Sequence, residues 1–391
     1  MEGDFIKLTD WLLPVSWIYG AGVRLRNQMF EMGMLKSRSF DIPVISVGNI
    51  TVGGSGKTPH VEYLINLLRD KVKVAVLSRG YKRKCKGYML ATSDTPMSDI
   101  GDEPYQMKKK FADIYVAVDK DRCHGIDQLT ANEETSDTDV ILLDDAYQHR
   151  YVKPGVNILL VDYHRLIMYD KLLPAGRLRE PQKGKARADI VIVSKCPAEL
   201  KPMEFRVITK AMNLFPYQKL YFTTLKYGSL RPIYGGEDRK LDTLTGDTSI
   251  LLLTGIASPQ QMIVDLKPYT ERITPLTFPD HHQYTDADID RINAEFEAMK
   301  GNDKMIVTTE KDNARLCGME GLSDEVKKNI YVLPVEVGFM LDQEEDFNEN
   351  IIGYVRKNSR NSILAKAKDD NKSDNSDNSV NRSRTISFRN N

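Results

Sequence analysis

Hydrophobic residues along the chain gather in short runs rich in Val, Ile and Leu, and helical patterns lie between many of these runs. Most of the runs are continuously apolar, which is typical of strands buried on both faces of a parallel sheet. Strands are predicted at residues 42–48, 72–80, 113–118, 139–145, 157–162 and 189–195. The pattern therefore predicts an α/β fold over residues 37–218, with a parallel sheet and helices on both faces.

The pattern changes near residue 218. Apolar and polar residues alternate more in the next segment, where Gly228 and Pro232 interrupt the run, so residues 219–240 are predicted to be a β linker or hairpin. Further apolar runs follow at residues 249–258, 271–282, 304–312 and 329–337. These runs predict a second, smaller α/β domain at residues 241–358.

The two ends of the chain differ from the middle. Residues 11–23, WLLPVSWIYGAGV, are 13 uncharged and mostly apolar residues, fewer than the roughly 20 that span a bilayer. Residues 1–36 are therefore predicted to form either a helix packed on the domain core or a helix lying in the membrane interface. The two tryptophans favour the membrane interface. Residues 359–391 are polar and poor in apolar side chains, so this tail is predicted to be disordered.

Composition narrows the class of protein. The 55 basic and 55 acidic residues cancel, which argues against a nucleic-acid partner because such proteins usually carry a net positive charge. The four cysteines are far apart and form no C-x-x-C pair, which predicts free thiols in a reducing compartment and no zinc site. We expect a monomer.

A glycine-rich loop follows the first predicted strand, in VGNITVGGSGKTPHVEYLI at residues 47–65. Glycines let the backbone curl around phosphate, lysine bridges phosphates and threonine offers a hydroxyl to Mg²⁺. The strict phosphate-binding (P-loop) pattern has glycine at position 51, where this chain has threonine. The predicted nucleotide-binding residues are Thr51, Val52, Gly53, Gly54, Ser55, Gly56, Lys57 and Thr58.

Two carboxylates end the most apolar strand, in DVILLDDAYQH at residues 139–149. Because the carboxyl ends of parallel strands form the ligand edge of a sheet, we assign Asp144 to Mg²⁺. Asp145 is expected to orient His149, one helical turn later. A helix-capping acidic loop is the alternative.

Three weaker motifs add polar groups. GDEP at residues 101–104 offers Asp102 and Glu103 for metal binding and proton transfer, or forms a surface turn. FPDHH brings Asp280 and the adjacent histidines His281 and His282, which are candidates for metal binding; a helix cap by Asp280 or Thr285 is the alternative. Arginines that suit phosphate recognition follow several strands; they are Arg79, Arg122, Arg177 and Arg179.

Taken in order, VGNITVGGSGKTP, SRGY, GDEP, DDAYQH, LPAGRLREP, FPDHH and TTEKD resemble the tetraacyldisaccharide 4′-kinase family, the lipid A 4′-kinases of Gram-negative bacteria. The resemblance covers roughly residues 5–340. It implies a P-loop kinase that uses ATP and Mg²⁺ to phosphorylate the 4′-hydroxyl of a tetraacylated glucosamine disaccharide 1-phosphate. It also implies a monotopic protein on the cytoplasmic face of the inner membrane, where this lipid A precursor lies.

The resemblance also implies residue roles. Asp102 accepts the proton of the sugar hydroxyl, and His281 from the second domain pairs with it. Thr58, Glu103 and Asp144 lie at the metal, and Asp145 with His149 forms a supporting pair. The predicted substrate contacts are Arg79, Arg122 and Arg177.

Two other classes share the predicted sheet. One is a GTP-dependent regulatory P-loop protein, for which Lys311-Asp312 has the wrong spacing to recognise guanine. The other is an ATP enzyme similar to dethiobiotin synthetase, which lacks the apolar N-terminal helix.

Overall fold

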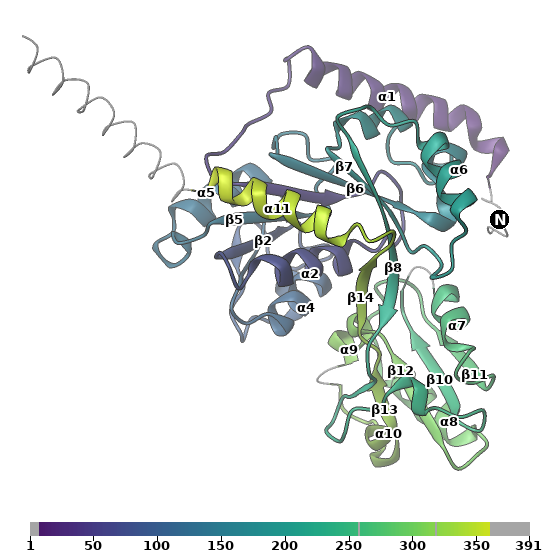
Figure 1. Cartoon of the computed structure of the whole chain (residues 1–391). Coiled ribbons are helices and arrows are strands. Elements are labelled where there is room, and N and C mark those ends of the chain that lie inside the picture. Colours follow the sequence, from purple (N-terminus) through teal and green to yellow (C-terminus); the bar gives the residue numbers. More distant parts are fainter. Residues whose placement is uncertain (1–7, 257–258, 317–318, 360–391) are drawn as a thin grey trace, which may run out of the picture.

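The computed structural model describes residues 8–256, 259–316 and 319–359, which form two α/β domains (Figure 1). The larger domain is built on a sheet of order β14-β8-β7-β6-β1-β5-β2-β4-β3, and the smaller on a sheet of order β11-β10-β12-β13-β9. The strands are β1 Val44–Gly48, β2 Val74–Ser78, β3 Met89–Leu90, β4 Tyr115–Val118, β5 Val140–Asp144, β6 Val156–Asp162, β7 Ile190–Ser194, β8 Lys219–Tyr227, β9 Arg231–Pro232, β10 Ser249–Thr254, β11 Ile273–Thr277, β12 Lys304–Thr308, β13 Ile330–Val332 and β14 Val335–Phe339.

Helices connect and cover these strands. They are α1 Leu13–Glu31, α2 Lys57–Leu68, α3 Met97–Ile100, α4 Asp102–Lys110, α5 Arg122–Ala131, α6 Pro202–Met212, α7 Gln260–Leu266, α8 Asp286–Ala298, α9 Glu310–Leu316, α10 Asp324–Asn329 and α11 Glu344–Asn358. Short 3₁₀ turns, including Tyr163–Arg165 and Gln182–Arg187, fill several connections.

Six strands of the larger sheet match the six apolar runs that predicted them, and they run parallel. The central strand β1 pairs with β5 on one side and β6 on the other, with Val47 opposite Asp144. The carboxyl ends of β1, β2 and β5 therefore meet at one edge, which is where the glycine-rich loop and the acidic pair lie.

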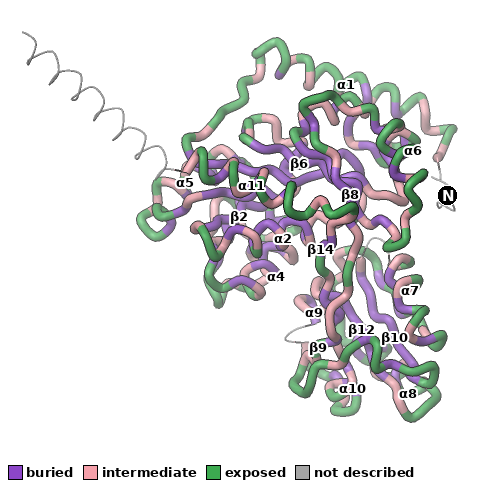
Figure 2. Tube along the Cα trace, in the orientation of Figure 1, coloured by how far each residue is buried: buried purple, intermediate pink, exposed green. Residues whose placement is uncertain are grey.

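The larger sheet is buried on both faces, which explains why its strands are continuously apolar. In β7, Ile190 and Ile192 pack in one core with α2, α4 and α11, whereas Val191 and Val193 pack in another with α6. The central strands are accordingly the most buried part of the chain (Figure 2).

The two domains are joined by a pair of antiparallel strands. The segment 219–240 was expected to be a linker, but β8 is a strand of the larger sheet, parallel to β7 and antiparallel to β14. β14 returns from the smaller domain, and α11 then packs its Phe347, Ile351 and Val355 into the core of the larger domain. Residues 335–358 thus pack with the larger domain, although periodicity assigned them to the second one.

Helix α1, near the N-terminus of the chain, lies along the larger domain (Figure 1). One side is held to the segment 172–179: the Ser16 hydroxyl donates to the Leu172 carbonyl at 2.9 Å, and the Tyr19 hydroxyl donates to the Arg179 carbonyl at 2.7 Å. The opposite side exposes large apolar residues, with Ile18 75% and Leu25 59% exposed. One side of α1 is therefore packed on the larger domain, as the core interpretation expects, whereas contact of the exposed side with a membrane stays a prediction.

Other sequence expectations concern smaller features. Cys85, Cys123 and Cys196 are free thiols, as predicted, and Cys317 lies outside the described residues. The predicted polar tail, from residue 360 onward, also lies outside them. Within the described ranges, no helix combines the length and the apolar character needed to cross a bilayer.

Candidate active site

The glycine-rich loop joins the end of β1 to the start of α2. Gly53 has φ +115° and Gly56 has φ +77°, values that L-residues rarely adopt. Thr51 is not among the residues with positive φ, and its backbone forms a bridge with Leu178. The position where the strict pattern has glycine therefore accommodates a side chain without a positive φ.

Neighbouring groups hold this loop in place. The Asn49 side-chain amide donates to Ser55 Oγ at 2.7 Å, and the Ser194 hydroxyl donates to the Ser55 carbonyl at 2.9 Å. The Val52 amide donates to the Arg177 carbonyl at 2.8 Å. These contacts shape the loop, and the amino end of α2 lies behind it, an arrangement suited to binding phosphate.

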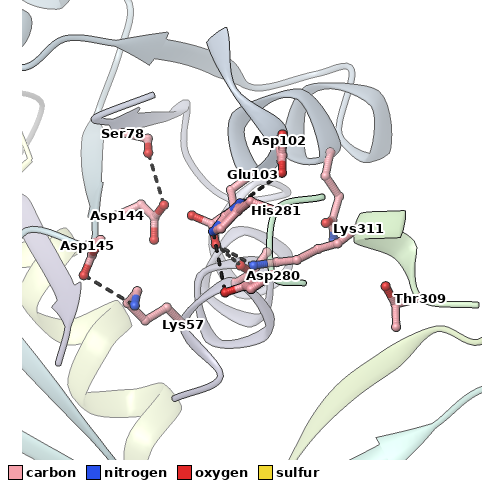
Figure 3. Close-up of polar contacts among 12 residues, drawn as sticks. Lys57, Ser78, Asp102, Glu103, Asp144, Asp145, Asp280, His281, Thr309 and Lys311 are labelled. Carbon is pink, nitrogen blue, oxygen red and sulfur yellow. Dashed lines mark hydrogen bonds and ion pairs between the residues drawn. The ribbon is translucent and has the colours of Figure 1, made fainter. Parts of the chain in front are cut away.

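Asp144 is fully buried at the end of β5. One carboxylate oxygen accepts a hydrogen bond from the Ser78 hydroxyl at 3.2 Å, while the other has no hydrogen-bond partner among the described residues (Figure 3). Burial raises the pKa of Asp144, and the negative charges of Glu103 and Asp145 raise it further. An orphaned carboxylate oxygen in such a place is suited to a cation.

Asp145 does not pair with His149, contrary to expectation. It lies 3.5 Å from Lys57 Nζ and 3.4 Å from Arg179 Nη1. The chain after Asp145 forms turns rather than a helix, so a spacing of four residues does not bring the two side chains onto one face. His149 instead packs edge-on against Tyr151, and its Nδ1 is buried without a hydrogen-bond partner in the described structure.

Asp102 and Glu103 lie in the first turn of α4, after Gly101 with φ +92°. His281, from the smaller domain, places Nδ1 3.1 Å from Asp102 Oδ2 (Figure 3). Arg315 Nη2 lies 2.7 Å from the same oxygen. Burial alone would raise the pKa of Asp102, but the contacts with His281 and Arg315 outweigh it and lower this pKa to about 2.

The two adjacent histidines diverge, which rules out a shared metal between them in this arrangement. His282 pairs with Asp288 at 2.9 Å and stacks on Phe278. The helix cap expected in this segment is made by Thr285, which forms a capping box with Asp288 at the start of α8.

Two cationic residues of α9 belong to the site although the sequence motifs did not predict them as site residues. Lys311 Nζ lies 2.5 Å from Glu103 Oε1, and Arg315 binds Asp102. The available signal was the TTEKD motif, which follows β12 at the carboxyl edge of the smaller sheet. The Lys311 contact, with that of Lys57, lowers the pKa of Glu103 against the opposing effect of burial.

The four arginines have different surroundings. Arg79 lines the main cavity, and the Arg177 guanidinium lies beside Gly53. Arg122 does not line that cavity: it is 2% exposed and donates to the backbone carbonyls of Asp119 and Asp144. Its predicted contact with substrate is therefore replaced by a structural one, whereas Arg179, to which no contact was assigned, does line the cavity.

A cavity of about 530 Å³ brings Lys57, Glu103 and His281 together. Its walls come from the glycine-rich loop, the ends of β2 and β5, the start of α4, the loop with Asp280 and His281, and α1. Among the described residues, no three His, Cys, Asp or Glu side chains form a group that could hold a metal by themselves. A cation here would need phosphate or water ligands as well, as Mg²⁺ commonly has.

Residues 8–356 match the family model of tetraacyldisaccharide-1-P 4′-kinase, LpxK. The chain belongs to this family. It is 60% identical to a tetraacyldisaccharide 4′-kinase of Phocaeicola vulgatus, over 93% of this chain and 99% of the relative. It is 54% identical to the kinase of the same name from Bacteroides thetaiotaomicron, over 93% of this chain and 98% of the relative.

A solved structure of the LpxK family has the same fold. The crystal structure of LpxK from Aquifex aeolicus, described as an "apo" form in complex with ATP, matches with a TM-score of 0.66 and 31% identity. The match covers 88% of this chain and 98% of that one. The family resemblance, the P-loop kinase fold and the kinase class predicted from the sequence are confirmed, and the two alternative classes are not favoured.

Proposed function

We propose that this chain transfers the γ-phosphoryl group of ATP to the 4′-hydroxyl of a tetraacylated glucosamine disaccharide 1-phosphate, a lipid A precursor. The observation that carries the proposal is the pairing of Asp102 with His281, because His281 lines the same cavity as the glycine-rich loop. The phosphate-binding loop and the partner of the candidate proton acceptor thus line one cavity. The family names of the relatives supply the substrate class.

ATP binding is assigned to the loop at residues 51–58. Its amides and the amino end of α2 bind the phosphates, and Lys57 neutralises their charge. The Lys57 side chain is only 12% exposed and contacts Asp145 in this structure. Asp145, itself held by Arg179, keeps the ammonium directed into the cavity.

Magnesium is assigned to Asp144, the Thr58 hydroxyl and Glu103. The fit rests on the orphaned Asp144 oxygen and on the Thr58 hydroxyl, which lies 3.4 Å from Glu103 Oε1. When bound, the ion would neutralise phosphate charge and orient the γ-phosphoryl group. Ser78 fixes the rotamer of Asp144 through its other oxygen.

Asp102 is proposed to accept the proton of the attacking hydroxyl, with His281 as its partner. Its low pKa keeps it ionised at neutral pH, so it is ready to accept a proton but weakly basic while Arg315 holds it. Because His281 and Arg315 come from the smaller domain, closure of the two domains would set the basicity of Asp102 and exclude water.

The exposed side of α1 is proposed to lie on the cytoplasmic surface of the inner membrane. Tyr19, Val23 and Asn27 of the same helix line the main cavity. One helix thus connects an apolar outer surface to the reaction site, which suits an acceptor whose acyl chains stay in lipid. The chain is proposed to act as a monomer, since both halves of the Asp102–His281 pair come from one chain.

The test is incubation of the purified chain with ATP, Mg²⁺ and the disaccharide 1-phosphate lipid in detergent micelles, with detection of the bis-phosphorylated lipid by mass spectrometry. The Lys57→Ala variant is the matched control. It should melt like the parent, because Arg179 still neutralises Asp145, and it should form no product. The absence of product with the parent chain, or equal product with Lys57→Ala, would refute the proposal.

A further inference from the structure

Two cavities meet in the cleft between the domains. The main cavity reaches from the glycine-rich loop to α1, and a second, of about 190 Å³, extends along α2 toward β8 and β14. The residues that line both cavities are Gly54, Lys57, Glu103, Asp280 and Lys311. These shared residues mark the place where a donor in one cavity and an acceptor in the other would meet. Two of them are lysines, one from each domain.

Lys311 enters this junction from the first turn of α9. Its ammonium lies 2.5 Å from Glu103 Oε1, and its side chain is 25% exposed (Figure 3). Glu103 is also contacted by the Thr58 hydroxyl at 3.4 Å and is assigned to Mg²⁺ above. When a divalent cation binds Glu103, Lys311 loses this carboxylate as a partner. The new negative charge nearest to its ammonium is then phosphate.

We propose that Lys311 is a catalytic residue whose ammonium binds the γ-phosphoryl group of ATP during transfer, after exchanging its contact with Glu103 for phosphate. The proposal rests on the phosphotransfer function proposed above. In the step, the acceptor oxygen bonds to the γ-phosphorus as the bond to the bridging oxygen breaks. ADP leaves with that electron pair, and the hydroxyl proton passes to Asp102.

The neighbouring contacts show that domain docking alone does not account for Lys311. Helix α9 also meets α4 through Glu310 with Lys110, at 2.8 Å, and through Arg315 with Asp102, at 2.7 Å. Of these cross-domain pairs, only Lys311–Glu103 consists of residues that line both cavities. Because Lys311 belongs to the smaller domain, its ammonium stabilises the charge on the phosphoryl group only when the two domains are closed. Transfer of the phosphoryl group to water in the open form is therefore limited.

The experiment compares Lys311→Ala, Lys311→Arg and Glu310→Gln. Glu310→Gln is the matched control because it removes the adjacent cross-domain pair while Lys110 keeps Glu62 as a partner at 2.7 Å. Calorimetry with Mg²⁺ measures the affinities for ADP and for the non-hydrolysable β,γ-methylene ATP. Their ratio isolates the contacts made to the γ-phosphoryl group.

We expect Lys311→Ala to weaken binding of the ATP analogue about tenfold while ADP binding stays within about threefold, and to lower kcat about 10²–10³-fold. Lys311→Arg should recover most of the analogue affinity, and Glu310→Gln should change both affinities by the same factor. The proposal is overturned if Lys311→Ala keeps the parent ratio of affinities, or if Glu310→Gln changes that ratio equally. Failure of the parent chain to phosphorylate the lipid would refute the proposed function, whereas the nucleotide titrations would still test Lys311.

Discussion

The Nδ1 atom of His281 lies 3.1 Å from Oδ2 of Asp102, although 179 positions separate the two residues in the chain. Asp102 begins α4 of the larger domain, and His281 lies in the loop after β11 of the smaller one, at φ +58°. The Tyr81 ring packs against the imidazole with a centroid distance of 5.0 Å. The pair therefore exists only while the two domains are docked.

This pairing predicts non-additive kinetics. Asp102→Asn should lower kcat about 10²–10⁴-fold, because it removes the proton acceptor while leaving the ATP site intact. His281→Ala should have a similar effect, and the double variant should lose little more than either single one, because paired residues act as a unit. Steady-state kinetics on the lipid acceptor checks this. Fully additive losses would show that the two residues act independently.

Arg79 and Arg122 are predicted to differ in what their loss changes. Arg79 lines the main cavity, so Arg79→Ala should raise KM for the acceptor or for ATP with little change in melting temperature. Arg122 is buried and donates to two backbone carbonyls, so Arg122→Ala should lower the free energy of unfolding by roughly 2–3 kcal/mol. Thermal melting and kinetics on both variants separate the two roles. A normal melting temperature with raised KM for Arg122→Ala would restore its expected contact with substrate.

The buried, neutral imidazole of His60 should make the free energy of unfolding fall in acid. Its Nδ1 contacts the Gly56 carbonyl at 2.7 Å and its Nε2 contacts Thr223 Oγ1 at 3.0 Å, so both ring nitrogens are used in the neutral form. Burial lowers the pKa of His60 to about 4. Between the unfolded pKa, about 6.5, and this value, the unfolded chain binds more protons, so stability falls as pH falls.

His60 should lower the free energy of unfolding by about 3 kcal/mol in total. This loss should be absent above pH 6.5 and complete near pH 4. Urea unfolding of the nucleotide-free and metal-free chain at several pH values measures it. His60→Gln is the control, because glutamine does not titrate, and its unfolding free energy should depend less on pH over this range. Identical pH slopes for the two proteins would contradict the prediction.

The exposed side of α1 predicts a membrane contact that can be removed without removing the helix. We define the α1 stripe as Val15, Ile18 and Leu25 of α1, Trp11 of the 3₁₀ turn before it and Met32 directly after it. These residues are spaced three, four or seven apart and are all at least 51% exposed. The variant Trp11→Ser/Ile18→Ser/Leu25→Ser should reduce binding to vesicles of anionic lipid at least tenfold. Its melting temperature and its activity on detergent-dispersed lipid should stay near those of the parent.

Substitution is a cleaner test than deletion of residues 1–36, because Ser16 and Tyr19 support the segment that holds the glycine-rich loop. Met203→Ser with Val264→Ser serves as the control, since both residues are exposed and lie on other helices. Vesicle flotation reports the bound fraction. If the control variant loses binding equally, or if the stripe variant still floats with vesicles, the membrane contact lies elsewhere.

The sequence by itself determined the features that depend on local chain properties. Continuous apolar runs predicted the parallel strands, because a strand buried on both faces has few positions for a polar side chain. Gly53, Gly56, Lys57 and Thr58 predicted the loop because backbone freedom and phosphate chemistry are properties of neighbouring residues. The ordered set of motifs was specific enough to indicate the family.

Only the tertiary structure decided which distant groups meet. Asp145 pairs with Lys57 and Arg179 because turns, not a helix, follow β5. Arg122 is buried because its guanidinium reaches the strand-end carbonyls rather than the cavity. Helix α11 returns to the larger core through β14, and α9 brings Lys311 and Arg315 onto α4. These contacts join residues far apart in the chain, and a local pattern cannot fix them because their geometry depends on how whole domains pack.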